Sequence, residues 1–406
     1  MTKSLTQLCC VSPEQKVIAL SSISNPVRLG VAGLGRAFAL SAPAIHAHPG
    51  IILVAAAEPN SEHRKSLEKN FGAKTYTDVT DLVNDPDVEA VYISTPHGLH
   101  KEHALAAINA GKAVLIEKPM TVSLEDASLL IEAAKKAAVT IIVGPSHSFD
   151  GPVKLAETLI AEGKIGRVRM IHALYATDFL YRPRTAAELS TDLGGGVVFS
   201  QAVHQIDLVR RLAGVPAQRV TARTGGAWDT NRPTEGAYSM LIDFSEGIYA
   251  NLTYSGYAHF DGDRLMENTS ELGIPKPDEF KNARKILESI EDELEFKSSR
   301  GFTSLETCPQ AKTHEHFGQV FVFGDRGDIR LTPNGVEITY CDGPIFYPAP
   351  FRTARAEVFD TLYTALREQA SPLQDGEWGR ASLEICHALL KSSETGDAVI
   401  LNYQKG

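Results

Sequence analysis

Apolar residues in the N-terminal part of the chain fall into short continuous runs, separated by longer stretches of mixed composition. The runs cover residues 27–32, 51–57, 90–94, 113–116 and 140–143. Runs of this kind are typical of strands that are buried on both faces of a sheet. The stretches between them predict helices at 37–45, 61–70, 78–84, 99–110 and 124–138. Strands that alternate with helices in this way predict a doubly wound parallel sheet.

The pattern changes after residue 236, where apolar and polar residues alternate along longer strands. Residues 237–244 and 248–255 flank Ser245-Glu246-Gly247, which is a hairpin signal. Further strands are predicted at 319–323, 329–331 and 336–340. This region therefore predicts a large, predominantly antiparallel sheet. A strand at 167–177 and helices at 152–162, 198–212, 353–369 and 376–391 accompany it.

The two patterns predict an α/β chain of two domains. Its 406 residues exceed what one ordinary core accommodates. We expect an N-terminal extension at 1–25, a nucleotide-binding domain at 26–150, an α+β substrate-binding and oligomerisation domain at 151–392 and a tail at 393–406. An insertion at about 261–317 interrupts the second domain and includes a charged helix predicted at 280–296. A lid, an oligomer contact and plain surface are all consistent with this insertion.

Composition narrows the class of partner. The formal net charge of −10 argues against nucleic acid or an anionic membrane as the main partner. No apolar run approaches the length of a membrane span. The five cysteines lack metal-ligand spacing, so we expect reduced thiols in the cytoplasm and no metal site. An anionic substrate would have to be bound by local positive charge.

A glycine pair follows the first strand directly. Gly33-Leu34-Gly35 leads into the first helix, and such a turn lets the backbone approach a pyrophosphate that the helix N-terminus attracts. Phe38 stands where a third glycine is usual. The second strand ends in Glu58, at the place where an acid holds the ribose hydroxyls of a dinucleotide. A carboxylate there repels a 2′-phosphate, so NAD is favoured over NADP, unless Arg64 turns toward the site.

Charged residues end the run at 113–116. Glu117 and Lys118 follow it and precede Pro119. The carboxyl ends of strands in such a sheet line the crevice where ligands bind, and Pro119 keeps Lys118 in an extended backbone. The Lys118 ammonium is therefore expected to project from the strand end. A surface ion pair that caps a strand would give the same local sequence.

A polar stripe follows three glycines in the second domain. Ser200, His204, Asp207 and Arg211 recur at helical spacing after Gly194-Gly195-Gly196. The stripe of an ordinary amphipathic helix meets solvent, and that interpretation stays open. The glycines favour a binding site, because their backbone can approach a ligand closely.

Taken together, the spaced motifs resemble the glucose–fructose oxidoreductase, inositol dehydrogenase and MocA family. The resemblance rests on residues 95–100 (TPHGLH), 107–112 (AINAGK) and 117–119 (EKP), and covers nearly all of 27–392. It implies an N-terminal Rossmann domain, NAD as the cofactor, and a C-terminal sheet that pairs subunits into a homo-oligomer. The implied nucleotide contacts are Gly33, Leu34, Gly35, Arg36, Ala37, Glu58, Thr95, Pro96, His97, His100, Glu117 and Lys118.

The resemblance also implies catalytic roles. The family lysine at the position of Lys118 contacts the nicotinamide ribose and the substrate. The family pattern D-x-x-x-H-x-x-D matches His204 and Asp207, but Ser200 replaces its first aspartate. We therefore assign proton handling to Lys118, as the base, and to His204.

Residues before the glycine turn indicate the substrate. Arg182 and Arg184 flank a proline, and their guanidinium groups are suited to bind carboxylates through two hydrogen bonds each. An exposed loop in which they pair with Glu188 or Asp192 is an equal alternative. Residues 181–184 (YRPR), the glycine turn and 201–207 (QAVHQID) most resemble the phthalate 4,5-cis-dihydrodiol dehydrogenase branch of the family.

That branch implies oxidation of cis-4,5-dihydroxy-4,5-dihydrophthalate to 4,5-dihydroxyphthalate, with reduction of NAD. The expected partner is thus a small anionic cyclic diol. The expected substrate contacts are Lys118, Tyr181, Arg182, Arg184, Gln201, His204 and Asp207. A sugar or inositol dehydrogenase is the alternative, since a neutral polyol would not need the arginines. A catalytically silent NAD-sensing regulator is a third reading, against which the presence of both Lys118 and His204 counts.

Overall fold

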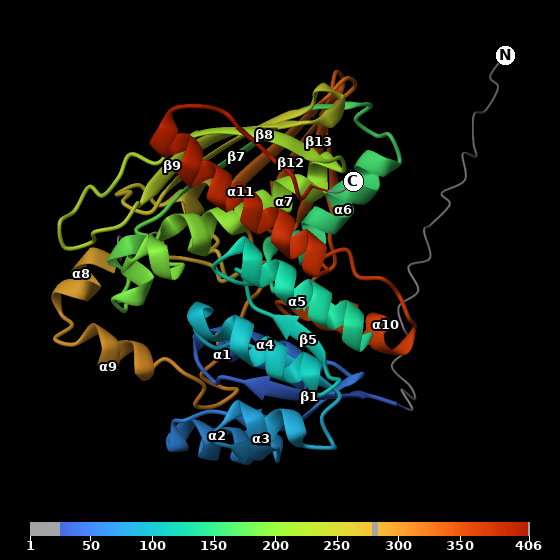
Figure 1. The fold of residues 1–406 in the computed structure, drawn as a ribbon. Helices are drawn as coiled ribbons and strands as arrows, with labels where there is room; N and C mark the ends of the chain where they lie inside the picture. The colour runs from blue at the N-terminus through green and yellow to red at the C-terminus, as the bar shows by residue number, and fades with distance from the viewer. Residues whose placement is uncertain (1–24, 278–282, 405–406) are drawn as a thin grey trace.

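The structure of the chain is a computed structural model that describes residues 25–277 and 283–404 (Figure 1). The N-terminal extension expected at 1–25 lies outside the described residues, except for Asn25. Two sheets organise the chain, one of six strands and one of nine. None of the helices in the two described ranges is both long and apolar enough to span a membrane.

The six-stranded sheet is entirely parallel, with the strand order β3-β2-β1-β4-β5-β6. This confirms the predicted doubly wound arrangement. The chain runs outward in one direction from β1 and in the other from β4, so ligands are expected beyond the carboxyl ends of these two strands. The strands are β1 (Val27–Ala32), β2 (Ile51–Ala57), β3 (Lys74–Tyr76), β4 (Ala90–Ile93), β5 (Ala113–Ile116) and β6 (Ile141–Val143). The connecting helices are α1 (Arg36–Ala47), α2 (Ser61–Phe71), α3 (Val79–Asn84), α4 (His100–Asn109) and α5 (Leu124–Ala137).

The nine-stranded sheet has the order β14-β13-β12-β11-β7-β10-β9-β8-β15 and is antiparallel except where β7 meets β10. The predominantly antiparallel second sheet is therefore confirmed. Its strands are β7 (Val168–Ala176), β8 (Ala217–Arg223), β9 (Ala237–Phe244), β10 (Tyr249–Ser255), β11 (Gln319–Gly324), β12 (Asp328–Thr332), β13 (Gly335–Tyr340), β14 (Gly343–Pro348) and β15 (Val399–Ile400). The helices of this half are α6 (Gly151–Ala161), α7 (Val203–Ala213), α8 (Ala283–Glu288), α9 (Glu293–Ser298), α10 (Ala356–Arg367) and α11 (Gly376–Thr395).

Helices α6, α7 and α11 lie along one face of the nine-stranded sheet (Figure 1). The buried positions of the sheet alternate with accessible ones, as on β9 and β10, where Leu241 and Tyr249 are exposed. In place of a tail after residue 392, the chain completes α11 and then adds β15 to the edge of this sheet beside β8.

Two helix predictions need correction. The helix predicted at 280–296 is not continuous. Residues 280–282 lie outside the described residues, and the rest forms α8 and α9 with a break between them. Asp292 produces the break, because its carboxylate accepts hydrogen bonds from the N–H groups of Leu294 and Glu295 and so caps a new helix.

The helix predicted at 198–212 begins with a π-helical turn over Val198–Ala202, and α7 follows it. A π-turn changes the hydrogen-bond pairing of the backbone and is often found at functional sites. Here the carbonyl oxygen of Ser200, within the π-turn, accepts a hydrogen bond from Lys118. The π-turn therefore supplies a backbone hydrogen-bond acceptor for Lys118 at the crevice.

The two halves of the chain share their packing. The C-terminal helix α11 packs against β8 of the second sheet and also against α5 and β6 of the first. Helix α10 buries Val358, Phe359 and Leu362 in the same hydrophobic cluster as Val27 and Leu29 of β1. The crevice at the carboxyl ends of β4 and β5 therefore lies between two halves that pack against each other.

Candidate active site

The glycine turn has the geometry of a dinucleotide cradle. Gly33 has a φ of +90°, and a Cβ there would lie 3.0 Å from the carbonyl oxygen of Ser94, so only glycine fits. A Cβ on Gly35 would meet nothing within 4 Å, and no side chain caps the N-terminus of α1 that follows. Space and uncapped N–H groups at a helix N-terminus are what a pyrophosphate requires. The residues present therefore fit NAD.

Glu58 lies at the edge of this cradle. One carboxylate oxygen accepts a 2.7 Å hydrogen bond from the N–H of Leu34, and the other a 2.9 Å bond from the N–H of Asn60. Arg64 does not turn toward the ribose position, because its guanidinium donates to the carbonyl oxygens of Glu58 and Pro59 at 2.6 and 2.8 Å. The negative charge of Glu58 is thus fixed beside the turn, while the nearby cation is bound to the backbone.

This arrangement predicts a preference for NAD over NADP. A like-charge contact costs several kcal/mol, so kcat/KM with NAD should exceed that with NADP by about a hundredfold. Glu58→Gln removes the negative charge, so the ratio of kcat/KM with NAD to kcat/KM with NADP should fall by roughly tenfold. Glu62→Gln, on the exposed face of α2, is the matched control and should leave the ratio unchanged. Equal efficiency of the wild type with both cofactors would contradict the role of Glu58.

A cavity of about 600 Å³ lies next to the cradle and contains the centre of the candidate site. It is lined at one end by Arg36, Ala37 and Leu40 of α1, and further along by His97, Glu117 and Lys118 from the ends of β4 and β5. Ser200, Gln201 and His204 line it from the π-turn and α7. The structure thus brings the predicted base, the predicted histidine and part of the predicted nucleotide site into one space.

Lys118 is half-buried, and its Nζ donates a 3.1 Å hydrogen bond to the carbonyl oxygen of Ser200. Burial lowers the pKa of Lys118 from its ordinary value. The charges of Glu117 and Glu271 oppose this shift, and those of Arg355 and Arg184 add to it. A carbonyl cannot supply the negative charge that the family aspartate would supply at position 200. Lys118 is therefore closer to the neutral, proton-accepting form than an exposed lysine.

His204 is buried among aromatic rings. Its ring centroid lies 4.9 Å from that of His147 and 5.1 Å from that of Phe317, and Nδ1 lies 3.3 Å from the hydroxyl of Ser146. Burial, together with the charge of Lys118, lowers the pKa of His204 well below its ordinary value. His204 is therefore neutral at physiological pH and suited to hold a hydrogen bond next to Lys118.

Several cavity residues were not predicted from the sequence. Arg355, which has a φ of +66° just before α10, places Nε 3.3 Å from Glu315 and Nη1 3.8 Å from Glu117. Glu117 also accepts a 2.6 Å hydrogen bond from the hydroxyl of Tyr92. His147 binds Asp150 through Nδ1 at 2.7 Å. Tyr92 and Arg355 thus both contact Glu117, next to Lys118 in the chain.

The two predicted arginines have different surroundings. Arg182 lines the cavity with its side chain 40% exposed, and Nη1 lies 3.5 Å from the carboxylate of Glu271. Arg184 is more deeply buried: it stacks on Phe179 with its guanidinium carbon 3.6 Å from the ring centroid, donates to the carbonyl of Phe179, and pairs with Glu188 at 3.5 Å. Arg182 is thus accessible to a substrate, whereas Arg184 supports the loop that presents it.

The insertion at 261–317 forms much of the far wall of this cavity. Glu271, Lys276, Lys297, Arg300 and Glu315 all come from it. Among the described residues that line the cavity, cations outnumber carboxylates, although the whole chain is acidic. The cations are Arg36, Lys118, Arg182, Arg184, Lys276, Lys297, Arg300 and Arg355, and the carboxylates are Glu117, Asp178, Glu188, Asp263, Glu271 and Glu315.

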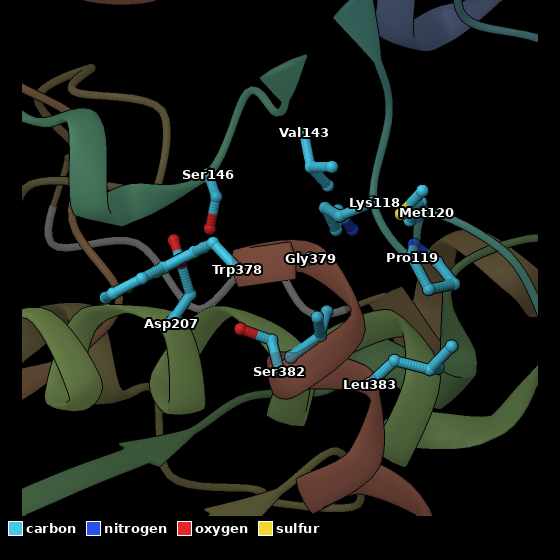
Figure 2. A pocket seen from close by; sticks show the side chains of 11 residues that line it. Lys118, Pro119, Met120, Val143, Ser146, Asp207, Trp378, Gly379, Ser382 and Leu383 are labelled. Atoms are coloured by element: carbon cyan, nitrogen blue, oxygen red, sulfur yellow. The ribbon is translucent and has the colours of Figure 1, made fainter. Parts of the chain in front are cut away.

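Asp207 lies in a different place from the other predicted substrate residues. It faces a separate cavity of about 20 Å³, shown in Figure 2 between α7, α11 and the end of β5. There its carboxylate accepts a hydrogen bond from the indole N–H of Trp378. Lys118 and Ser146 form the boundary shared by this small cavity and the large one. Asp207 therefore lies behind the boundary formed by Lys118 and Ser146 and does not line the large cavity.

Tyr181, His100 and the glycine turn at 194–196, which the sequence suggested as binding residues, make contacts within the protein. The ring of Tyr181 lies outside the cavity lining, and the guanidinium of Arg284 covers it at 3.7 Å. His100 is buried, with its two ring nitrogens 2.9 and 2.8 Å from the carbonyl oxygens of Pro119 and Thr95, so it ties two strand-end loops together. The three glycines make room for protein atoms and not for a ligand, since a Cβ on Gly196 would collide with the carboxylate of Glu235.

Both halves of the chain match models of known protein families. Residues 27–145 match the family described as "Oxidoreductase family, NAD-binding Rossmann fold", and residues 153–269 match the "GFO/IDH/MocA C-terminal domain". Together the two matches cover more than half of the chain, including nearly all of the nucleotide-binding half. The first also establishes NAD as the cofactor that this domain binds.

A curated relative and two solved structures extend the comparison. The chain is 41% identical over 382 residues to a 1-carboxy-3-chloro-3,4-dihydroxycyclohexa-1,5-diene dehydrogenase of Comamonas testosteroni, covering 91% of this chain and 95% of that one. A crystal structure of a candidate dehydrogenase from Bordetella bronchiseptica RB50 is 36% identical, with a TM-score of 0.88, covering 93% of this chain and 100% of that one. The WlbA dehydrogenase of Bordetella pertussis, solved with NADH and UDP-GlcNAcA, shares the fold with 20% identity and a TM-score of 0.68, covering 93% and 99%.

Proposed function

Since the chain belongs to the GFO/IDH/MocA family of NAD-binding oxidoreductases, we propose that it oxidises a carboxylated cyclic cis-diol with NAD. The specific substrate that we propose is cis-4,5-dihydroxy-4,5-dihydrophthalate, which would give 4,5-dihydroxyphthalate. The relative from Comamonas testosteroni supports the substrate class, because its name describes a ring that carries a carboxylate and two adjacent hydroxyls.

The observation that carries the proposal is the position of Arg182. Its guanidinium lines the same cavity as Lys118 and is accessible from it. Removing a carboxylate from water is costly unless it is hydrogen-bonded, and a guanidinium supplies both charge and two donors. A carboxylate bound by Arg182 would hold the ring so that its hydroxyls lie toward Lys118.

The chain's own residues handle the protons of this reaction. Lys118 takes the proton of the hydroxyl being oxidised, and burial, which lowers the pKa of its amine, favours the neutral form that can do so. His204 holds the oxygen as the carbon–oxygen double bond forms. Bound NAD supplies the acceptor for the hydride that leaves the carbinol carbon. The resulting ketone then moves one ring proton to its oxygen and becomes an aromatic catechol, which makes the oxidation strongly favourable.

A neutral polyol is the second candidate. In the structure Arg182 is paired with Glu271, and Arg184 with Glu188, so both charges are already neutralised. A sugar or inositol would leave these pairs intact, whereas a carboxylate must compete with Glu271. The regulator hypothesis has no comparable support, because a sensor does not require a lysine with a lowered pKa beside a buried histidine.

A substrate panel tests the proposal. Formation of NADH would be followed with the phthalate diol, a monocarboxylated cis-dihydrodiol, an uncharged cis-dihydrodiol, inositol and glucose. We expect the two carboxylated diols to have the highest kcat/KM, with the uncharged diol at least about tenfold lower, because one charge-assisted hydrogen bond contributes roughly 1.5–3 kcal/mol. Faster oxidation of inositol or glucose than of either acid would replace the proposal with the polyol alternative.

Two further features are proposed with this function. The exposed Leu241 and Tyr249 support pairing of two copies through the accessible face of the nine-stranded sheet, which sedimentation of the purified chain tests. The free thiols of Cys308, Cys341 and Cys386 are consistent with work in a reducing compartment such as the cytoplasm.

A further inference from the structure

The insertion at 261–317 reaches the nucleotide cradle. After α9 the chain crosses from the second half of the molecule to the first (Figure 1). There the N–H of Phe302 donates a 2.9 Å hydrogen bond to the carbonyl oxygen of Leu34, which belongs to the glycine turn. The ring of Phe302 is fully buried, with its centroid 5.2 Å from that of Phe38 and 5.8 Å from that of Phe71.

Two other contacts fix this segment. A Cβ on Gly301 would lie 2.2 Å from the imidazole of His63, so the backbone packs directly on α2. The N–H of Leu305 donates to the side chain of Asn70 at 3.2 Å. Residues 301–305 are therefore anchored on the helices next to the cradle, and they determine where the preceding residue, Arg300, lies.

Arg300 and Arg36 form a pair of like charges beside the glycine turn. Both line the large cavity, and Arg36 is the first residue of α1. Among the described residues, no carboxylate lies within ion-pair distance of either guanidinium. The other arginines of the cavity are each paired: Arg182 with Glu271, Arg184 with Glu188 and Arg355 with Glu315. Burial and the charge of Arg300 lower the pKa of Arg36 to about 10.

We propose that Arg300 is a cofactor-binding residue that acts with Arg36 on the pyrophosphate of the dinucleotide. Two neighbouring cations that pair with no carboxylate of the described residues, at the uncapped N-terminus of α1, form a site for an anion of two charges. The pyrophosphate of NAD carries that charge, and this helix terminus is where a Rossmann domain binds it. The insertion is then part of the cofactor site, because it supplies one of the two guanidiniums from above the glycine turn. The inference does not depend on which diol is oxidised.

Binding of NADH without substrate tests the role of Arg300. Arg300→Ala should raise the Kd for NADH, measured by NADH fluorescence, by about tenfold, since it removes one charge-assisted contact. Arg300→Lys should recover part of the lost NADH affinity, because lysine keeps the positive charge but lacks the paired N–H donors of a guanidinium. Lys312→Ala removes an equal charge from an exposed position of the same insertion and should leave the Kd unchanged.

Competition with fragments locates the contact. ADP-ribose carries the pyrophosphate, whereas adenosine lacks it. Arg300→Ala should weaken ADP-ribose about as much as NADH and leave adenosine unchanged. An unchanged Kd for NADH in Arg300→Ala would overturn the proposal, and so would an equal loss in Lys312→Ala. A raised KM for the diol with unaltered NADH binding would assign the site to the substrate carboxylate and would likewise overturn it.

Discussion

Replacing Lys118 with alanine or methionine should reduce kcat for diol oxidation by a factor of about 100 or more, the usual effect of losing a general base. The structure places the Lys118 amine in the cavity with a lowered pKa, where it donates a hydrogen bond to the carbonyl oxygen of Ser200. Binding of NADH should change little, because the turn, Glu58 and Arg36 remain. Lys101→Ala, which removes an exposed lysine paired with Asp126, should retain full activity.

The pH dependence distinguishes a base from a structural lysine. Wild-type oxidation should rise with pH as Lys118 loses its proton, with a midpoint below the ordinary lysine value of 10.5. That rise should be absent in Lys118→Met. Because the folded-state pKa of Lys118 is lower than its unfolded value, its charge reduces stability at pH values below that folded pKa, and stability recovers as the pH rises through it. Lys118→Met should therefore melt no lower than wild type at neutral pH. Activity within a few-fold of wild type would remove Lys118 from the mechanism.

Arg182→Ala should raise KM for the phthalate diol by about thirtyfold, while binding of NADH stays nearly unchanged. Losing one partner of a buried charge pair costs about 2–5 kcal/mol. The lower end of that range, about 2 kcal/mol, is expected because Arg182 is partly exposed and already faces Glu271 before substrate binds. KM for an uncharged cis-dihydrodiol should change little in the same variant.

Two controls accompany the Arg182 variant. Arg169→Ala removes an exposed arginine that pairs with Asp325, and should have no effect on either diol. Arg184→Ala should act differently from Arg182→Ala, because the buried Arg184 supports its loop through Phe179 and Glu188, so its main effect should be a lower melting temperature. An equal rise of KM for charged and uncharged diols in Arg182→Ala would mean that its guanidinium does not bind a carboxylate.

The sequence predicted the parallel sheet more completely than the antiparallel one. Buried parallel strands are continuous apolar runs, which single them out from the helices between them. The strand β8 escaped prediction because it is largely polar, with Arg219, Thr221 and Arg223 on its accessible side. The strand β14 begins and ends near prolines, Pro344 and Pro348, which a strand tolerates only at a sheet edge.

The structure agrees with the prediction that the ends of two neighbouring strands line one space. His97 and Lys118 follow β4 and β5 and do line one cavity. The same rule would have found His147, which follows β6. No local signal could have found Arg355, because tertiary packing alone brings the start of α10 to Glu117. Helical spacing placed His204 and Asp207 on one face, but Asp207 lines the small cavity and accepts a hydrogen bond from Trp378 of α11, whereas His204 lines the large one.

The packing of α10 has a consequence for how the protein is made. A ribosome completes the six strands of the parallel sheet long before it reaches residues 356–367, yet Val358, Phe359 and Leu362 belong to the hydrophobic cluster that covers β1. Until those residues emerge, Val27, Leu29 and their neighbours lack part of their cover, and apolar surface left open on a nascent chain favours association with other chains. The nucleotide-binding half is therefore synthesised first but completed last, and a chain that stops before α10 is left with an unfinished core in the half that holds the cofactor.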